Sequence, residues 1–225
     1  MNLLKQKVII FGFNQTAKLA KYYLDNDSEF EVVAFTVHKE FMDKVEFEGK
    51  PIYNYEDLEK YFDPNEYYLF APMTGKGLNK IREKVYLEGK YKGFKFISYI
   101  SSKATVFTKD IGENCFILED NTIQPFTKIG NNVVLWSGNH IGHDSIIEDS
   151  VFITSHCVIS GNCLIKKYSW LGVNSTLRNN IVLEEGSLIA MSASIIKNTE
   201  PYKVYMGVPG KICGDSSDEK IAMSL

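Results

Sequence analysis

Aliphatic residues recur at every sixth position over the second half of the chain, without one interruption. The run comprises Ile111, Ile117, Ile123, Ile129, Leu135, Ile141, Ile147, Ile153, Ile159, Ile165, Leu171, Leu177, Leu183, Ile189 and Ile195. Neither the 3.6-residue period of a helix nor the two-residue period of a strand produces a spacing of six. Such a repeat predicts a solenoid, in which each unit buries its apolar residue against the neighbouring units.

Each unit is interpreted as one short strand followed by a corner, so that three units close one triangular coil. The aliphatic side chains then point into the prism and stack about 4.8 Å apart, which gives five coils a height of about 24 Å. The residue four positions later is usually small or β-branched, as at Cys115, Cys157 and Cys163. It also turns inward, so these cysteines are expected to be core residues rather than nucleophiles. The pattern predicts a parallel β-helix but does not determine its hand.

The first hundred residues alternate between strand and helix patterns. Strands are expected at 8–11, 30–35, 67–71 and 94–97, and helices at 17–24, 57–62 and 76–87. This alternation predicts a small Rossmann-like α/β domain, a parallel sheet with helices on both faces. Ligands of such sheets bind at the carboxyl ends of the strands, here residues 12–16, 36–38 and 72–73.

Composition excludes several classes of function. The 225 residues include 25 Lys and Arg against 28 Asp and Glu, so no basic footprint for nucleic acid or anionic membrane is visible. No apolar run approaches the roughly 20 residues of a membrane span. The start, residues 1–7, lacks the pattern of a cleavable signal, and the four cysteines lack zinc-type spacing. A cytoplasmic protein without a metal is therefore expected.

The repeat, with the opening Lys7-Val8-Ile9-Ile10-Phe11-Gly12 and the closing Gly207-Val208-Pro209-Gly210-Lys211, resembles the hexapeptide-repeat acyltransferases. More narrowly, the chain is similar to the sialic acid O-acetyltransferase and nucleotide-amino-sugar N-acetyltransferase family of bacterial surface-glycan (O-antigen and capsule) pathways. The resemblance implies a left-handed β-helix and a homotrimer. It implies a sugar-nucleotide-binding domain at 1–100, an acyltransferase domain at 101–212 and a C-terminal tail at 213–225.

Acyl transfer needs a base, donors for the oxyanion, and a groove for the coenzyme. His143 is followed by Asp144 on a predicted corner, where the carboxylate could orient the imidazole and raise its basicity. One coil later the same position is Gly161, whose amide would lie uncovered beside the ring. The resemblance implies His143 as general base, Asp144 as its orienting group and the Gly161 N–H as oxyanion donor.

The donor implied by the resemblance is acetyl-CoA, bound along the outside of the coils near a seam between subunits. The matching positions are Gly172, Val173, Met191 and Ser192, with Lys197 and Lys211 expected near phosphates. Plain solvation of the two lysines is an equally good interpretation.

The predicted acceptor site lies mostly in the first domain. The turn after the first strand keeps only the first glycine of a dinucleotide fingerprint, and no acid follows the second strand, which argues against NAD. The resemblance implies a sugar nucleotide there instead, with helix-terminal amides near its phosphate. The candidate residues are Gly12, Asn14, Gln15, His38, Pro72 and Met73, with His156 of the repeat as a further substrate contact.

The function expected is acetylation of a nucleotide-linked amino sugar, with O-acetylation of sialic acid or another sugar as the alternative. A carbonic anhydrase of the same fold would need a His-x4-His pair, but the residue five after His143 is Glu148. A non-catalytic scaffold that binds a sugar nucleotide is the third possibility. Phe152 stands where several relatives carry a second histidine, so the sequence assigns no role to a second ring.

Overall fold

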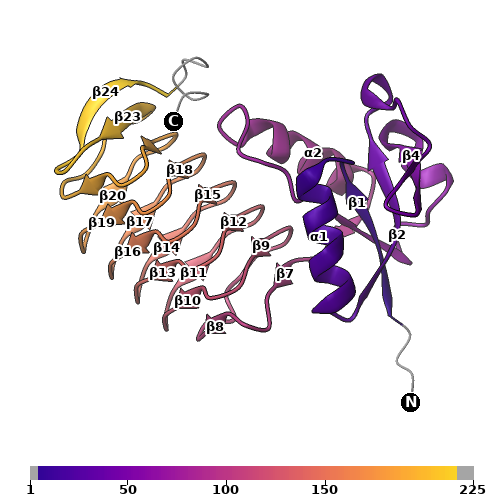
Figure 1. Cartoon of the computed structure of the whole chain (residues 1–225), viewed down its shortest axis with the longest axis horizontal. Coiled ribbons are helices and arrows are strands. Elements are labelled where there is room, and N and C mark those ends of the chain that lie inside the picture. Colours follow the sequence, from indigo (N-terminus) through magenta and orange to yellow (C-terminus); the bar gives the residue numbers. More distant parts are fainter. Residues whose placement is uncertain (1–4, 217–225) are drawn as a thin grey trace.

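The computed structural model describes residues 5–216. They form an α/β region followed by a stack of triangular coils (Figure 1). The elements of the first part are β1 (Gln6–Phe11), α1 (Gln15–Asn26), β2 (Phe30–Val37), η1 (Lys39–Phe41), β3 (Glu46–Phe47), β4 (Lys50–Asn54), η2 (Tyr55–Lys60), β5 (Tyr67–Phe70), α2 (Lys80–Tyr91) and β6 (Lys95–Phe96). Within residues 5–216, neither helix has the length and apolar character needed to cross a bilayer.

The sheet of the α/β region has the order β3-β4-β2-β1-β5-β6, and all pairs except β3·β4 are parallel. Because successive side chains of a strand point to opposite faces, β1 serves two cores. Val8 and Ile10 pack with α1, while Ile9 and Phe11 pack on the side that carries η2 and α2. The expected sheet with both faces covered is confirmed.

Two local expectations differ from the structure, and one element was not expected. The helix expected at 76–87 begins at Lys80, because Gly77, Leu78 and Asn79 have φ values of 64°, 50° and 66°, outside the right-handed helical region. The helix expected at 57–62 is the 3-10 helix η2, which begins after Asn54. The hairpin β3–β4 was not anticipated, because β3 has only two residues and β4 has one buried residue and no apolar run.

The coils contain two-residue strands separated by four-residue corners. They are β7 (Tyr99–Ile100), β8 (Thr105–Val106), β9 (Phe116–Ile117), β10 (Thr122–Ile123), β11 (Lys128–Ile129), β12 (Val134–Leu135), β13 (His140–Ile141), β14 (Ile146–Ile147), β15 (Phe152–Ile153), β16 (Val158–Ile159), β17 (Leu164–Ile165), β18 (Trp170–Leu171), β19 (Thr176–Leu177), β20 (Val182–Leu183), β21 (Leu188–Ile189) and β22 (Ser194–Ile195). The antiparallel pair β23 (Lys203–Met206) and β24 (Lys211–Asp215) follows.

These strands form three parallel faces, which we name after their early members. The β9 face contains β7, β9, β12, β15, β18 and β21, and continues into β23 and β24; the β10 face contains β8, β10, β13, β16, β19 and β22; the β11 face contains β11, β14, β17 and β20. The predicted tail at 213–225 starts inside β24, and its residues 217–225 lie outside the described part of the chain, as do residues 1–4.

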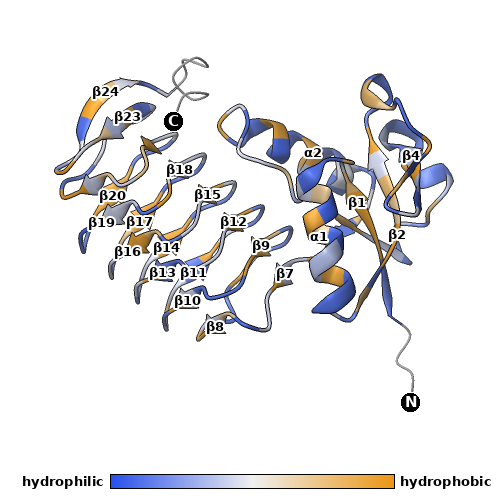
Figure 2. Cartoon of the chain, viewed as in Figure 1, coloured by the Kyte–Doolittle hydropathy of each residue, from blue (hydrophilic) through white to orange (hydrophobic). Residues whose placement is uncertain are grey.

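The period of six is explained by the core and by the corners. The periodic residues from Ile117 to Ile195 are all buried in one continuous cluster, with Ile111 partly buried against it, and the inward Cys115, Cys157 and Cys163 lie in the same cluster. Hydrophobic residues recur along the strands of successive coils, which form the walls of the prism (Figure 2). At nearly every corner the third residue after the periodic one has a positive φ near 60°. Asn and Asp tolerate that region best, which explains their frequency at these positions.

The three corners are numbered by the face they follow. Corner 1 follows the β9 face and contains Glu119, Ser137 and His156; corner 2 follows the β10 face and contains Phe126, His143 and Gly161; corner 3 follows the β11 face and contains Asn132, Ser150 and Tyr168. The α/β region covers the β9 face, where Phe116, Val134 and Phe152 are buried in the same cluster as α1. Its helix α2 runs along corner 3, with Glu83 bonded to Lys167 (2.6 Å) and Lys90 to Glu113 (2.7 Å).

Candidate functional site

His143 and Asp144 form a hydrogen-bonded pair on corner 2. The ring Nδ1 lies 2.7 Å from Oδ2 of Asp144, and both side chains are about half exposed. Asp144 has a φ of 57°, which turns its carboxylate back toward the preceding residue. The backbone N–H of His143 donates to Oε1 of Gln124 on the preceding coil at 2.9 Å, which fixes the corner. Within residues 5–216, Nε2 of the ring has no hydrogen-bond partner, so this nitrogen is available to accept a proton.

Gly161 lies directly against the His143 ring. A Cβ added to Gly161 would be 2.7 Å from Nε2 and 2.8 Å from Cε1 of His143, so only glycine fits beneath the ring in this position. Position 142 requires glycine for a similar reason, because a Cβ added to Gly142 would lie 2.5 Å from the amide nitrogen of Gly161. No group in the described part of the chain accepts a hydrogen bond from that amide. At the corresponding positions, the amide of Glu113 donates a hydrogen bond to the side chain of Asn131, and the amide of Asn131 donates one to the side chain of Asp149. Corner 2 therefore combines a free imidazole nitrogen with a free amide donor.

Corner 1 carries a second polar group, centred on Glu119. Its carboxylate accepts hydrogen bonds from Tyr23 of α1 and from Ser137, both at 2.7 Å. Partial burial would raise the pKa of Glu119, but these two hydrogen bonds outweigh it and hold the pKa below its usual value. His156 lies one coil above Gly138, where an added Cβ would be 2.4 Å from Nδ1 of the ring. Within residues 5–216, a histidine ring thus lies over a glycine at corners 1 and 2, and of these two rings only the one at corner 2 is hydrogen-bonded to a carboxylate.

The residues predicted to bind the coenzyme do not share one corner. Gly172, Val173, Met191 and Ser192 lie on corner 1, with Val173 and Met191 exposed. Lys197 is exposed on corner 2, three coils beyond His143, and Lys211 is exposed on β24. The β10 face separates the two corners within one chain. A Cβ on Gly172 would meet the amide of Met191 at 2.6 Å, so this glycine uncovers an amide just as Gly142 does.

At the carboxyl ends of β1 and β5 lie four of the predicted acceptor residues, Gly12, Asn14, Gln15 and Pro72. These strands pair with Ile10 opposite Phe70, so Gly12 and Pro72 follow neighbouring strand ends. Gly12 has a φ of 100°, which favours glycine. Asn14 is the N-cap of α1, and its side chain accepts a hydrogen bond from the amide of Ala17 at 3.1 Å. Gln15 is the first helical residue and is exposed.

His38 points away from this group. Its ring lies between η2 and α2, on the face of the sheet opposite α1, with Nδ1 2.9 Å from Glu56 and Nε2 3.5 Å from Glu88. It lines a cleft of about 1120 Å³ together with Tyr55, Tyr91 and other residues of η1, η2 and α2. The structure therefore places His38 in a different hollow from Asn14. The backbone oxygen of Met73 accepts a hydrogen bond from Arg82 at 3.3 Å.

No group of three or more His, Cys, Asp or Glu side chains suited to a metal ion occurs within residues 5–216. Burial raises the pKa of the Cys115 thiol to about 11 and also raises that of Cys157. Both thiols therefore stay protonated and unreactive at neutral pH.

The coils match a known repeat. The family model described as bacterial transferase hexapeptide (six repeats) matches residues 110–142 and 126–161. A probable macrolide acetyltransferase from Lysinibacillus sphaericus is 35% identical over 66 residues, which are 29% of this chain and 37% of that protein. The chain spans less than half the length of the curated relatives it matches. Residues 110–161 are thus hexapeptide repeats of the bacterial transferase type.

Two solved structures share the architecture over nearly the whole chain. The acetyltransferase domain of PglB from Neisseria gonorrhoeae FA1090 in complex with acetyl coenzyme A aligns with a TM-score of 0.82 and 18% identity, covering 93% of this chain and all of that one (100%). PerB from Caulobacter crescentus in complex with CoA and GDP-perosamine aligns with a TM-score of 0.81 and 19% identity, covering 92% and 97%. The predicted combination of an α/β region and a left-handed parallel β-helix is confirmed.

Sequence reasoning missed three residues that shape the site. Gln124 fixes the backbone of His143, and Gly142 leaves the Gly161 amide uncovered. Gly142 had a visible signal, because glycine also follows the periodic residue at 112, 130 and 172. Arg82 is fully buried between α2 and the coils, yet it stands in the charged run Lys80-Ile81-Arg82-Glu83-Lys84, which is typical of an exposed helix. No sequence pattern marked it.

Proposed function

We propose that the protein transfers an acetyl group from acetyl-CoA to the amino group of a nucleotide-linked sugar. The observation that carries this proposal is the free Nε2 of His143 beside the uncovered amide of Gly161. Support also comes from the hexapeptide repeats and from the shared fold of PerB, solved with CoA and GDP-perosamine. No metal is needed for this chemistry.

In the proposed reaction the acceptor nitrogen attacks the thioester carbonyl carbon and forms the new N–C bond. Nε2 of His143 takes the proton of the attacking amine, and Asp144 holds Nδ1 and stabilises the imidazolium. The carbonyl oxygen becomes an oxyanion that accepts a hydrogen bond from the Gly161 amide. When the intermediate collapses the C–S bond breaks, and the thiolate of coenzyme A leaves with the proton returned by the imidazolium.

The placement of the two half-sites implies that more than one copy of the chain takes part. In a triangular prism corner 2 lies opposite the β9 face, and the α/β region covers that face. An acceptor held at the ends of β1 and β5 therefore lies on the far side of the prism from His143 of the same chain. We infer that the α/β region of one subunit presents the acceptor to His143 of another, within a homotrimer.

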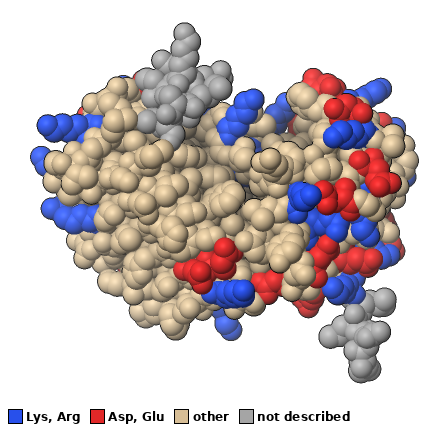
Figure 3. Space-filling view, viewed as in Figure 1, with Lys and Arg blue, Asp and Glu red and all other residues tan. Residues whose placement is uncertain are grey.

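The surface of the coils supports this assembly. Charged side chains gather over the α/β region, whereas the visible surface of the coils is largely uncharged (Figure 3). The outward residues of the β10 face, Thr122, His140, Val158, Thr176 and Ser194, include no Lys, Arg, Asp or Glu. Val158 on this face and Ile146 on the β11 face are each about 40% exposed. Contact between copies would bury these apolar side chains and close a coenzyme groove between corner 2 of one copy and corner 1 of the next.

The proposal is tested by incubating the purified protein with acetyl-CoA and a panel of UDP-, dTDP-, GDP- and CMP-linked amino sugars. Release of the coenzyme thiol, together with a product heavier by one acetyl group, is expected with at least one acceptor. The same sugars bearing a hydroxyl in place of the amine distinguish N- from O-acetylation. Binding of a sugar nucleotide without release of the thiol from acetyl-CoA, whichever acceptor is supplied, would contradict the proposal and favour a non-catalytic scaffold.

A further inference from the structure

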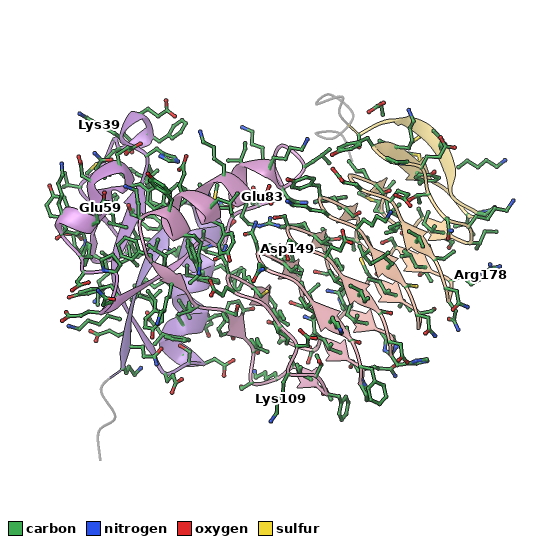
Figure 4. All side chains as sticks on the ribbon, turned by 180° about the vertical axis from the view of Figure 1, so that it is seen from behind. Lys39, Glu59, Glu83, Lys109, Asp149 and Arg178 are labelled. Atoms are coloured by element: carbon green, nitrogen blue, oxygen red, sulfur yellow. The ribbon has the colours of Figure 1, made fainter. Side chains whose placement is uncertain are left out.

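Arg82 is a fully buried cation whose hydrogen-bond partners are all neutral. It precedes Glu83 on α2, and Figure 4 shows Glu83 next to the coil that carries Asp149, where its carboxylate accepts a hydrogen bond from Ser150. Its guanidinium donates to the backbone oxygens of Met73, Thr74, Asn132 and Val151 and to the side-chain oxygens of Asn79 and Asn132, at 3.0–3.5 Å. It also lies 5.6 Å from the ring centre of Phe152. No ion pair to Arg82 is formed within residues 5–216.

Burying this charge is costly, so the contacts it makes must be maintained together. Burial lowers the pKa of Arg82 to about 9, which still leaves the guanidinium charged at neutral pH. Two of its acceptors, Met73 and Thr74, belong to the segment that follows β5, and two others, Asn132 and Val151, belong to the coils. Arg82 therefore joins the carboxyl end of β5 directly to corner 3.

The segment 72–79 that Arg82 holds has an unusual backbone. Gly77, Leu78 and Asn79 have positive φ values in succession, and a leucine in that region is strained. The segment is held at several points: Leu78 packs on Leu188 and Val204, and a Cβ on Gly75 would be 2.8 Å from Trp170. Within it, the Asn79 side-chain oxygen accepts a hydrogen bond from Arg82 at 3.2 Å. Strained backbone that persists because its surroundings fix it is common at ligand-binding segments.

We propose that Arg82 is a positioning residue, which fixes the acceptor-binding end of β5 on the coils. This inference rests on the proposed function, in which the acceptor bound near Pro72 and Met73 must reach an acetyl group held on the coils. The reacting atoms must come within about 3–3.5 Å, and a displacement of about 1 Å costs on the order of 100-fold in rate. Arg82 acts through the segment 72–79 and does not itself contact the reacting atoms.

The test compares Arg82→Lys and Arg82→Met with the wild-type protein. Arg82→Lys keeps the charge but loses the planar fork that bonds two parts of the molecule at once. We expect it to lower kcat by about 10- to 100-fold and to raise the KM for the sugar nucleotide, while the KM for acetyl-CoA stays within about twofold. Lys90→Met is the matched control, because Lys90 also joins α2 to the coils, through Glu113, but is partly exposed. It should leave all three constants unchanged.

Amide hydrogen exchange gives a readout that does not depend on activity. In Arg82→Met the amides of Met73, Asn79 and Lys80, which are bonded within the segment, should exchange at least about tenfold faster. Coil amides remote from Arg82, such as that of Thr176 on the β10 face, should be unaffected. Two results would overturn the inference. One is wild-type exchange of the segment in Arg82→Met; the other is an equal rise of the KM for the sugar nucleotide and the KM for acetyl-CoA in a folded Arg82→Lys protein. If the wild type acetylates no sugar nucleotide, the proposed function fails, and the exchange result alone decides whether Arg82 fixes the segment.

Discussion

Replacing Gly161 by alanine separates the chemistry of corner 2 from the stability of the coil. The new Cβ would lie 2.7 Å from Nε2 of His143, so the ring must retreat by about 0.7 Å or rotate to reach an ordinary contact distance. Either movement disturbs the 2.7 Å bond between Nδ1 and Asp144, and the methyl group partly covers the amide. Displacing the base and hindering the oxyanion donor should together lower kcat by about 100- to 1,000-fold.

Stability should change little in the same variant. The φ of Gly161 does not lie in the left-handed region, so alanine is not strained there. The His143 side chain is 52% exposed and can swing outward at little cost. Alanine also lowers the conformational entropy of the unfolded chain, which stabilises the fold by about 0.4–1 kcal/mol and offsets the cost of moving the ring. The Tm should therefore stay within about 3 °C of the wild type.

Gly49→Ala provides the opposite control. Gly49 lies in the β3–β4 turn with a φ of 72° and no atom within 4 Å of an added Cβ. Alanine there should cost about 1 kcal/mol of folding free energy through backbone strain, without changing kcat. The assays are steady-state acetyl transfer and thermal unfolding of both variants. Wild-type kcat in Gly161→Ala, or a rate loss that follows its loss of Tm, would refute the assignment of corner 2.

Three further predictions concern the base, the core and the contact between the two parts. His143→Ala should lower kcat by about 100- to 10,000-fold and Asp144→Asn by about 10- to 100-fold, with the circular dichroism spectrum unchanged; steady-state rates near wild type would remove the proposed base. Ile153→Ala empties a fully buried position in the middle of the prism and should cost about 2–5 kcal/mol in denaturant unfolding; a loss below 1 kcal/mol would argue against a packed core. Hydrogen bonds from Ser102 and Tyr99 lower the pKa of Asp27 to about 2, below its ordinary value, so its stabilising effect is present above about pH 4 and is lost as the pH falls toward 2. Asp27→Asn should remove that part of the acid dependence of unfolding, and an unchanged pH profile would contradict it.

The sequence predicted the prism far better than it predicted the contact between the two parts. Inward positions such as Ile153 are determined by a local period, and the equivalence of positions one coil apart places Gly161 on His143 without further information. The contact of Arg82 with Asn132 joins residues 50 apart in two different architectures. No periodicity relates them, and a buried arginine looks in sequence like any exposed helical cation.

Glycine in the repeat illustrates the same limit. Gly112, Gly130, Gly142 and Gly172 share one position of the repeat, and at each an added Cβ would meet the backbone of the next coil. Sequence therefore identifies a class of close approach. It does not show that, within residues 5–216, the amide of Gly161 beyond Gly142 has no acceptor, whereas the amide of Asn131 beyond Gly112 donates to the side chain of Asp149 at 2.7 Å. That difference depends on the side chain present in the neighbouring coil.

The proposed acceptor site and the proposed base lie on opposite sides of the prism, which leads to a test by subunit mixing. His143→Ala removes the base but leaves the α/β region intact, whereas Gln15→Glu adds a negative charge at the exposed start of α1 and should repel the phosphates of a sugar nucleotide. If each site takes its acceptor from one subunit and His143 from the next, a randomly mixed trimer restores a site wherever a His143→Ala subunit precedes a Gln15→Glu subunit. With equal amounts of the two, about one quarter of the sites should recover. Co-expression with two different tags yields the mixed trimers, and each variant expressed alone sets the background. Mixed trimers no more active than that background would mean that a single chain supplies both halves of its own site.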